Sequence, residues 1–427
     1  APEISGILIG SNTTSTDTPT IVLKDGDVGY FYNKTGTEFK VDASQLTSVT
    51  ADDTIVAFLP SGCTYNAETG EVTKEASEVY VAYIGEQGYT TLEEAFAALN
   101  ETNHTLTLTE AGEAAWTYEN VYWMAGGQTG SAATLKAAMT AAYAADVNSI
   151  TIICKPNAKI AMSDQHIDVT GDITIYANGA DFCHCDRTQG RNDDLSIGTY
   201  AAPTGGKATV NVYDAKNLTV WGQPVSGRND EWTVNLVNCE NDGHGMIMYR
   251  NEADFTSKIY VTLTGCKATG YADSIVHTTA DGSIMITDCE FTSNCAPVNI
   301  AHKQNGVMTV TVKNTKFSNC GKVSNNNYFA PVRIVNNNET GAVNVSVDGC
   351  TFTNTVGVNG DILLGDGRTG KESHDVSLTV KNTAAKVMAQ KPNYYDANGN
   401  VADGTMGKTQ DVAKSEEVTT SVETLLP

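Results

Sequence analysis

The chain has 427 residues, of which 41% are hydrophobic, so it is long enough to bury one large elongated core or two compact ones. Its formal net charge of -23 repels nucleic-acid phosphates and anionic lipid headgroups, and no basic run offsets that charge. We therefore expect no nucleic-acid partner, and no stretch is apolar for long enough to insert into a membrane. The scattered carboxylates leave Ca²⁺ as a candidate ion, but the sequence commits to no cofactor.

The first segment, residues 1–84, is predicted to be a small β-rich module. Short apolar runs such as "GILIG" and "DTIVAFLP" alternate with Asp-Gly and Thr-Gly turns, which is typical of strands joined by tight turns. The chain opens with "APEIS", without a methionine or a hydrophobic leader, as in the mature form of an exported protein. We therefore expect an extracellular location, either secreted or associated with the cell wall.

Residues 85–148 are predicted to form a linking and capping region with two short helices. Thr91 is a suitable N-cap, and Glu93 and Glu94 follow in the first turn, where carboxylates stabilise the positive end of the helix dipole. An alanine-rich second helix is expected over residues 132–145. Because it comes just before the first strand of a repeat, we expect it to cover apolar groups and strand edges at the open end.

The segment 149–390 contains seven copies of one short strand pattern. Each copy has two apolar residues separated by one other residue, and this period of two indicates a strand with one buried face. The apolar pairs are Val210/Val212, Val234/Leu236, Val261/Leu263, Ile284/Ile286, Val310/Val312, Val345/Val347 and Leu378/Val380.

Each of these strands is followed by a bend residue and then by a small residue. Gly, Asn and Asp enter the left-handed region at the lowest steric cost, so they mark a bend. The bend column is Asp214, Asn238, Gly265, Asp288, Asn314, Gly349 and Asn382. The small column, which suits a narrow interior corner, is Ala215, Cys239, Cys266, Cys289, Thr315, Cys350 and Thr383. Phe291, Phe317 and Phe352 are then expected to fill the wider interior.

The copies recur at irregular intervals, and a second strand such as "APVNIAH" or "APVRIVNN" lies within each interval. This arrangement resembles the right-handed, single-stranded parallel β-helix of the pectate-lyase-like superfamily. The resemblance implies an all-β fold over residues 149–390 with an N-terminal capping helix. The earlier segment "YTTLEEAFAALNETNHTLTLTEAG" is similar to the opening of repetitive secreted proteins of gut bacteria. Residues 391–427 lose the repeat and are expected to form a C-terminal cap or arm.

A second resemblance concerns catalysis. Polygalacturonase-like glycosidases carry an Asp pair, a Gly-His-Gly and an Arg-Ile-Lys in this order, and the present chain has "GRNDDLSIG", "GHG" and "PVRIV". The resemblance implies Asp193 and Asp194 as the carboxylate pair of an inverting hydrolase, with His244 and Arg333 as their partners. The chain departs from the family pattern, because no Asn-Thr-Asp precedes the Asp pair and the last motif lacks its lysine.

An eliminating lyase would instead need an Arg or Lys base beside carboxylates that hold Ca²⁺. Arg333 is the best base that the second strands offer, and the neighbouring coils are expected to carry Asn299 and Leu363 at the same position. That position therefore lacks a carboxylate cluster, which favours a structural role for the arginine.

Cysteines suggest two further sites. In "FCHCD", an extended strand would turn Cys183 and Cys185 to one face and His184 to the other, so the three side chains would not close on one metal ion. The spacing of Cys295 and Cys320 on adjacent coils would allow a disulfide.

These observations favour a secreted or cell-surface protein that is adhesin-like or binds glycans, with a glycan or the surface of a host or neighbouring cell as its partner. Two alternatives stay open. One is a polysaccharide hydrolase or lyase of the same fold, and the other is a structural component of a surface layer or fibre. Enzymatic activity is left undecided, with the preference against it, and the oligomeric state is open.

Overall fold

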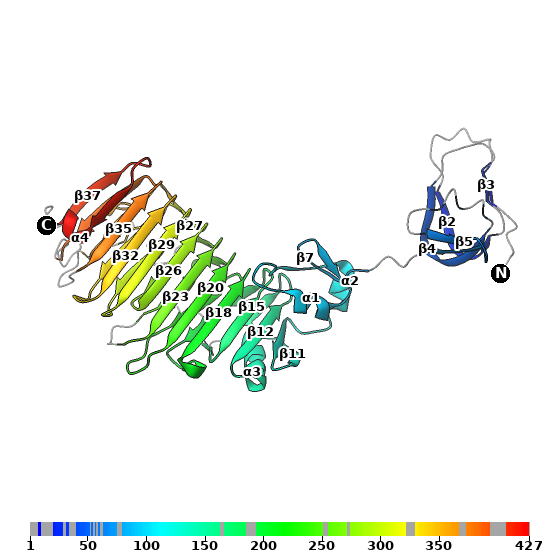
Figure 1. Cartoon of the computed structure of the whole chain (residues 1–427), viewed down its shortest axis with the longest axis horizontal. Helices are drawn as coiled ribbons and strands as arrows, with labels where there is room; N and C mark the ends of the chain where they lie inside the picture. Colours follow the sequence, from blue (N-terminus) through cyan, green and yellow to red (C-terminus); the bar gives the residue numbers. More distant parts are fainter. Residues whose placement is uncertain are drawn as a thin grey trace. The chain divides into compact units, whose positions relative to one another are not determined.

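The computed structural model divides the chain into two compact units, Ala1–Tyr80 and Val81–Pro427 (Figure 1). It describes residues 7–9, 20–28, 31–33, 40–51, 53, 56, 59, 63–74, 79–162, 166–184, 194–250, 255–270, 274–321, 329–366, 373–392 and 407–426.

The first unit is built mainly of strands. Strand β1 (Ile7–Ile9) pairs in parallel with β3 (Phe31–Asn33). A four-stranded sheet has the order β2-β4-β6-β5, and its strands are β2 (Thr20–Val28), β4 (Lys40–Ala51), β5 (Cys63–Asn66) and β6 (Glu71–Lys74). The β2–β4 pair is parallel, and the other two pairs are antiparallel.

The second unit begins with a small layer that we call the lateral module, residues 81–118. Its elements are β7 (Ala82–Ile84), β8 (Gln87–Tyr89), α1 (Leu92–Ala98), β9 (Leu106–Leu108) and α2 (Glu110–Ala115). Thr91 is the N-cap of α1, as predicted, and its side chain accepts the N–H of Glu94. Apolar residues of the module pack on Tyr122, Tyr176 and Tyr213 of the following sheet.

Most of the second unit consists of parallel strands in long sheets. The first long sheet has twelve strands in the order β11-β10-β12-β15-β18-β20-β23-β26-β29-β32-β35-β38, and Figure 1 shows them side by side along the unit. They are β10 (Val121–Ala125), β11 (Gln128–Ala132), β12 (Ser149–Cys154), β15 (Asp172–Tyr176), β18 (Lys207–Tyr213), β20 (Glu231–Val237), β23 (Lys258–Thr264), β26 (Asp281–Thr287), β29 (Val307–Lys313), β32 (Ala342–Asp348), β35 (Val376–Lys381) and β38 (Val418–Ser421). Only the pairs that involve β10, β11 and β38 are antiparallel in this sheet.

The second long sheet has ten strands, and a short sheet has five. The ten strands are, in order, β14 (Ile167–Asp168), β17 (Asp194–Ile197), β19 (Thr219–Gly222), β22 (Ile247–Tyr249), β25 (Val276–Thr278), β28 (Val298–His302), β31 (Val332–Asn336), β34 (Ile362–Leu364), β36 (Ala385–Gln390) and β37 (Gly407–Val412). The five are β21 (Glu240–Asp242), β24 (Lys267–Thr269), β27 (Glu290–Thr292), β30 (Lys316–Ser318) and β33 (Thr351–Thr353). A separate parallel pair joins β13 (Lys159–Met162) and β16 (Asp181–His184).

The chain visits these three sheets in rotation. From β20 to β34, consecutive strands enter the first long, the short and the second long sheet in turn, and from β23 on each pairs with the strand of the previous round. The prediction of stacked parallel strands is confirmed, and the arrangement is compatible with a β-helix-like fold. No helix among the described residues is both long enough and apolar enough to cross a membrane.

The apolar pairs predicted from the repeat lie in register and face the core. Val210 pairs with Val234, and the column continues without a shift through the later strands to Leu378. All fourteen members of the seven pairs are buried. Because equivalent residues stack directly on each other, every strand shields the apolar face of its neighbours from water.

The bend column is also confirmed, because all seven of its residues have a positive φ, between 49° and 65°. A side chain with a Cβ is strained in this region, whereas glycine is not and the short polar side chains of Asn and Asp tolerate it. At Gly265 the space is restricted as well, since a Cβ there would lie 2.5 Å from Oδ1 of Asn238.

The cost of this bend can be measured at Asn314, which is exposed and has a φ of 50°. Asn314→Ala is expected to lower the free energy of unfolding by about 1 kcal/mol, because alanine adopts the left-handed region less readily. Asn314→Gly is expected to change it little, since glycine enters this region freely. Urea unfolding of the two variants makes the comparison, and equal losses would contradict the assignment of the bend.

The small column is buried at the corner that follows the first long sheet. Its thiols donate to carbonyl oxygens of the preceding turn, as Cys266 does to Leu236 at 3.3 Å. The disulfide that the spacing of Cys295 and Cys320 would allow is not formed, because Cys320 is a free thiol that donates to the carbonyl of Phe291 at 3.3 Å. Burial raises the pKa of Cys320 to about 11.

Helix α3 (Leu135–Ala145) lies within the range predicted for the second helix, and Thr134 is its N-cap. The side chains of Leu135, Ala138, Met139 and Ala142 are buried in the core cluster of the long sheets. These positions recur every three or four residues, so one stripe of the helix is apolar and packs on the strands. Met139 of this stripe also lines the pocket described below, together with Lys136, Thr140 and Tyr143 of the same helix.

Candidate functional site

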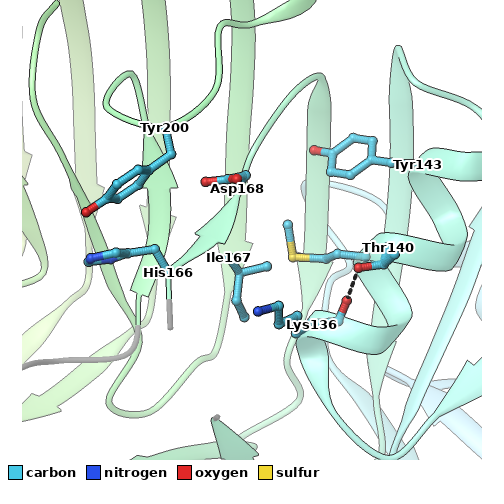
Figure 2. A pocket seen from close by; sticks show the side chains of 8 residues that line it. Lys136, Thr140, Tyr143, His166, Ile167, Asp168 and Tyr200 are labelled. Atoms are coloured by element: carbon cyan, nitrogen blue, oxygen red, sulfur yellow. Dashed lines mark hydrogen bonds between the residues drawn. The ribbon is translucent and has the colours of Figure 1, made fainter. Parts of the chain in front are cut away.

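A pocket of about 430 Å³ lies between α3 and the first strands of the second long sheet (Figure 2). Its lining residues are Lys136, Met139, Thr140, Tyr143, His166, Ile167, Asp168 and Tyr200. The first four come from the helix and the last four from the strand side. The pocket is therefore a product of packing, because it joins segments that are separated in the sequence.

The helical wall follows from the period of the helix. Lys136, Met139, Thr140 and Tyr143 are spaced by three, four and seven residues from the first, so they share one face. Tyr143 donates its hydroxyl to the carbonyl of Gly171 at 3.0 Å, which ties the helix to the loop before β15. Burial raises the pKa of Tyr143, so its hydroxyl stays protonated.

The strand wall follows from the period of two. Ile167 is buried, while His166 and Asp168 on either side of it point away from the core. The ring of His166 is held by Asp194 of the adjacent strand, with Nδ1 and Oδ1 2.7 Å apart. The side chain of Asp194 is only 2% exposed, whereas that of His166 is 30% exposed. A buried carboxylate thus fixes the orientation of a partly exposed imidazole.

Aromatic rings extend this wall. The ring of His166 stacks on Tyr200 with centroids 4.8 Å apart and on Trp221 with centroids 4.7 Å apart. Tyr200 is 58% exposed, which is unusual for so large an apolar ring that is held by stacking. It presents a solvent-exposed aromatic face at the pocket, held in place by stacking on His166, and such faces bind amphipathic ligands.

The polar groups of the pocket carry both signs of charge. Asp168 lies between the rings of Tyr200 and Tyr143 in the view of Figure 2, and Lys136 approaches from the helix below. Loss of water in this concave site raises the pKa of Asp168, and the nearby charges of His166 and Lys136 lower it in part. The carboxyl group can therefore take up a proton more readily than an ordinary surface aspartate.

The pocket continues into a row of outward side chains on the second long sheet, which we call the outward row. Its members stand opposite each other on successive strands: Asp168, Ser196, Trp221, Met248, His277, Asn299, Arg333, Leu363 and Met388. Asp168 is exposed and Ser196 is buried. Trp221, Met248 and His277 are partly exposed, whereas the residues from Asn299 onward are buried. Beyond Ser196, the accessible part of the row thus runs from Trp221 to His277.

Three of the four catalytic candidates from the sequence lie within the described residues, and they are far apart along the coil. Asp194 lies beside the pocket, and Asp193 lies outside the described residues. His244 is partly buried in the bend between β21 and β22. Arg333 is on β31, five strands along the sheet from β17, which corresponds to about 24 Å at the usual strand spacing. The structure therefore does not bring Asp194 and Arg333 into one site.

Arg333 has the surroundings expected of a structural arginine. It is 3% exposed, and it stands in register with Asn299 and Leu363, as predicted. Its guanidinium donates to Oδ1 of Asn299 at 2.8 Å and to Oδ2 of Asp366 at 2.9 Å.

The metal prediction at "FCHCD" lies mostly outside the described residues, which include neither Cys185 nor the side chains of Cys183 and His184. Among the residues that the structure describes, no three metal-ligating side chains form a cluster.

His166, Asp168 and Tyr200 are not among the residues predicted from the sequence. The available signal was the alternation in "HIDV", where two polar residues flank a buried isoleucine. Lys136 lies in the alanine-rich helix, whose sequence pattern predicts only a capping role. No family model, no curated protein and no solved structure matches the chain.

Proposed function

We propose that the chain is a secreted or cell-surface, adhesin-like protein that binds a glycan in the pocket beside α3. The observation that carries this proposal is the exposed Tyr200 ring at a concave site that also holds Lys136, Asp168 and Thr140. Sugars present apolar faces and hydroxyl groups together, so an aromatic platform with nearby charged groups and hydroxyls suits them. The volume of about 430 Å³ lies in the range of small-ligand sites.

The scaffold proposed for this site is a right-handed, single-stranded parallel β-helix. Connections between parallel strands of one sheet are right-handed in nearly all proteins, which supports this hand for the rotating strand order. We also propose that α3 caps the N-terminal end of the coil, because its apolar stripe packs on the core beside β12 and β13. A net charge of -23 suits a protein that stays soluble outside the cell.

Replacing Tyr200 with alanine is expected to weaken glycan binding by about tenfold or more, because a central aromatic anchor supplies much of the affinity of such a site. A glycan array of neutral and acidic polysaccharides first identifies a ligand for the wild-type protein. Calorimetric titration with that ligand then compares the variants. Tyr260→Ala is the control, since Tyr260 is 37% exposed but lies on the first long sheet, away from the pocket.

Two outcomes would contradict this proposal. The first is that no polysaccharide on the array binds the wild-type protein. The second is that a ligand binds Tyr200→Ala and Tyr260→Ala equally well, which would place the glycan outside the pocket.

A second candidate function is polysaccharide cleavage, which the raised pKa of Asp168 favours. A carboxyl group whose pKa is raised by burial, beside an imidazole fixed by a buried carboxylate, is a suitable candidate for acid–base chemistry. Reducing-end and ultraviolet-absorbance assays on the bound polysaccharide detect hydrolysis and elimination. Cleavage that is lost in Asp168→Asn and kept in Asp411→Asn, an exposed control on β37, would establish this activity.

A further inference from the structure

His277 is an unusual member of the outward row. It stands between Met248 and Asn299 in register and is partly exposed. Within the described part of the chain, its ring accepts and donates no hydrogen bond. Burial, followed by the charges of Arg250 and Arg333, lowers the pKa of His277 to about 3. Its imidazole is therefore neutral near pH 7 and offers one N–H donor and one acceptor.

Arg250 lies diagonally across from this histidine. Met248 is opposite His277, and Arg250 follows two positions later, just after the end of β22, so it is a diagonal cross-strand neighbour. Its side chain is exposed. Diagonal neighbours on adjacent strands are within reach of long side chains, so the guanidinium and the imidazole can contact one ligand group.

Arg250 also differs from the other arginines that the structure describes. Arg228 pairs with Asp230, and Arg333 pairs with Asp366. No carboxylate among the described residues pairs with Arg250, although the chain has 50 acidic residues and a net charge of -23. Because Arg333 is neutralised by Asp366, the positive charge here comes from Arg250, an exposed arginine that no described carboxylate pairs with and that lies beside a neutral histidine on an acidic protein.

We propose that Arg250 and His277 bind an anionic group, a carboxylate or a sulfate ester, carried by the glycan that occupies the pocket. The guanidinium has five N–H donors in a planar fork that matches such oxyanions, and the imidazole N–H adds another donor. His277 stands on the outward row four strands from Asp168 of the pocket, which is about 19 Å at the usual strand spacing. One extended ligand can therefore contact the pocket and the anion site together.

This inference rests on the proposed glycan-binding function, and three tetrasaccharides test the two separately. They are neutral galactotetraose, tetragalacturonate and a sulfated carrageenan tetrasaccharide, each titrated at low ionic strength so that charge contacts are not screened. We expect one or both of the anionic sugars to bind at least about tenfold more tightly than the neutral one. The two anionic arms show whether the site prefers carboxylate or sulfate.

Arg250→Gln is expected to remove this preference and leave the affinity for the neutral sugar unchanged. The matched control is Lys258→Gln, which removes an exposed positive charge from β23 on the other long sheet. A second measurement follows the ring resonances of His277 by NMR. An anion beside the ring favours its charged form, so the pKa of His277 should rise when the anionic sugar binds.

Each outcome decides one proposal or the other. If the neutral tetrasaccharide binds in a way that depends on Tyr200, and the anionic ones bind no more tightly, the anion site is wrong and the glycan-binding function is supported. A change in the ring resonances of His277 when inorganic sulfate is added, if it is absent in Arg250→Gln, would support the anion site even if no sugar binds. If the anionic preference survives Arg250→Gln, or if neither sugars nor sulfate bind, the anion site is wrong.

Discussion

Replacing Phe317 with alanine is expected to lower the free energy of unfolding by about 3–5 kcal/mol, which is the usual cost of deleting a large buried ring. Phe317 is 1% exposed and lies between Phe291 and Phe352, with ring centroids 5.6 Å and 4.9 Å away. Removing the middle ring leaves a cavity that the neighbouring strands can fill only partly, because the backbone ladders on both sides fix their separation.

Urea unfolding of the full chain, followed by circular dichroism, measures this loss. The control is Thr309→Ala on the exposed face of β29, which should change the free energy of unfolding by no more than about 0.5 kcal/mol. If Phe317→Ala were as mild as the control, the stacked aromatic column could not be part of the core.

The second large effect is expected at Asp366, whose replacement by alanine should cost about 3–5 kcal/mol. The side chain of Asp366 is fully buried, and it accepts a hydrogen bond from Arg333, whose side chain is 4% exposed. Without the carboxylate, the guanidinium keeps its charge in a site that has little water. The penalty is therefore that of an uncompensated buried charge, which greatly exceeds the value of an ordinary surface pair.

Glu113→Ala provides the comparison, because Glu113 and Lys155 form an ion pair of the same length, 2.9 Å, with side chains 53% and 28% exposed. Breaking that pair should cost less than about 1 kcal/mol. The double variant Arg333→Met with Asp366→Leu should recover much of the loss, since apolar residues of similar size can replace a buried pair. Equal losses for Asp366→Ala and Glu113→Ala would contradict the buried position of the arginine.

The repeat could be predicted from the sequence because each of its columns obeys a local rule. The positive φ at Asn238 and Gly349 follows from the residue type at a bend, and the burial of Val310 and Val312 follows from a period of two. Such rules act within a few residues, so they are visible along the chain. Stacking then repeats the same local result in every turn.

The pocket could not be predicted in the same way, because it depends on contacts between distant segments. Tyr143 and Asp168 meet only because α3 packs beside the start of the second long sheet. The catalytic candidates show the opposite case, because their order in the sequence can be read but their positions in space cannot. Asp194, His244 and Arg333 follow the order of a known motif along the chain, but the rotation of strands places them on different turns. Motif order alone therefore said little about their separation in space.

Register along the first long sheet is the central claim, since the pocket, the outward row and the anion site are all assembled by the same stacking of turns. The outward residues Thr209, Thr309, Asn344 and Ser377 belong to one register column, with Thr309, Asn344 and Ser377 four, five and six strands from Thr209. Electron paramagnetic resonance of spin labels at Thr209 and each of the others measures their distances. Parallel stacking predicts about 19, 24 and 29 Å, rising by one strand spacing each time. Distances that fail to increase in equal steps would contradict it.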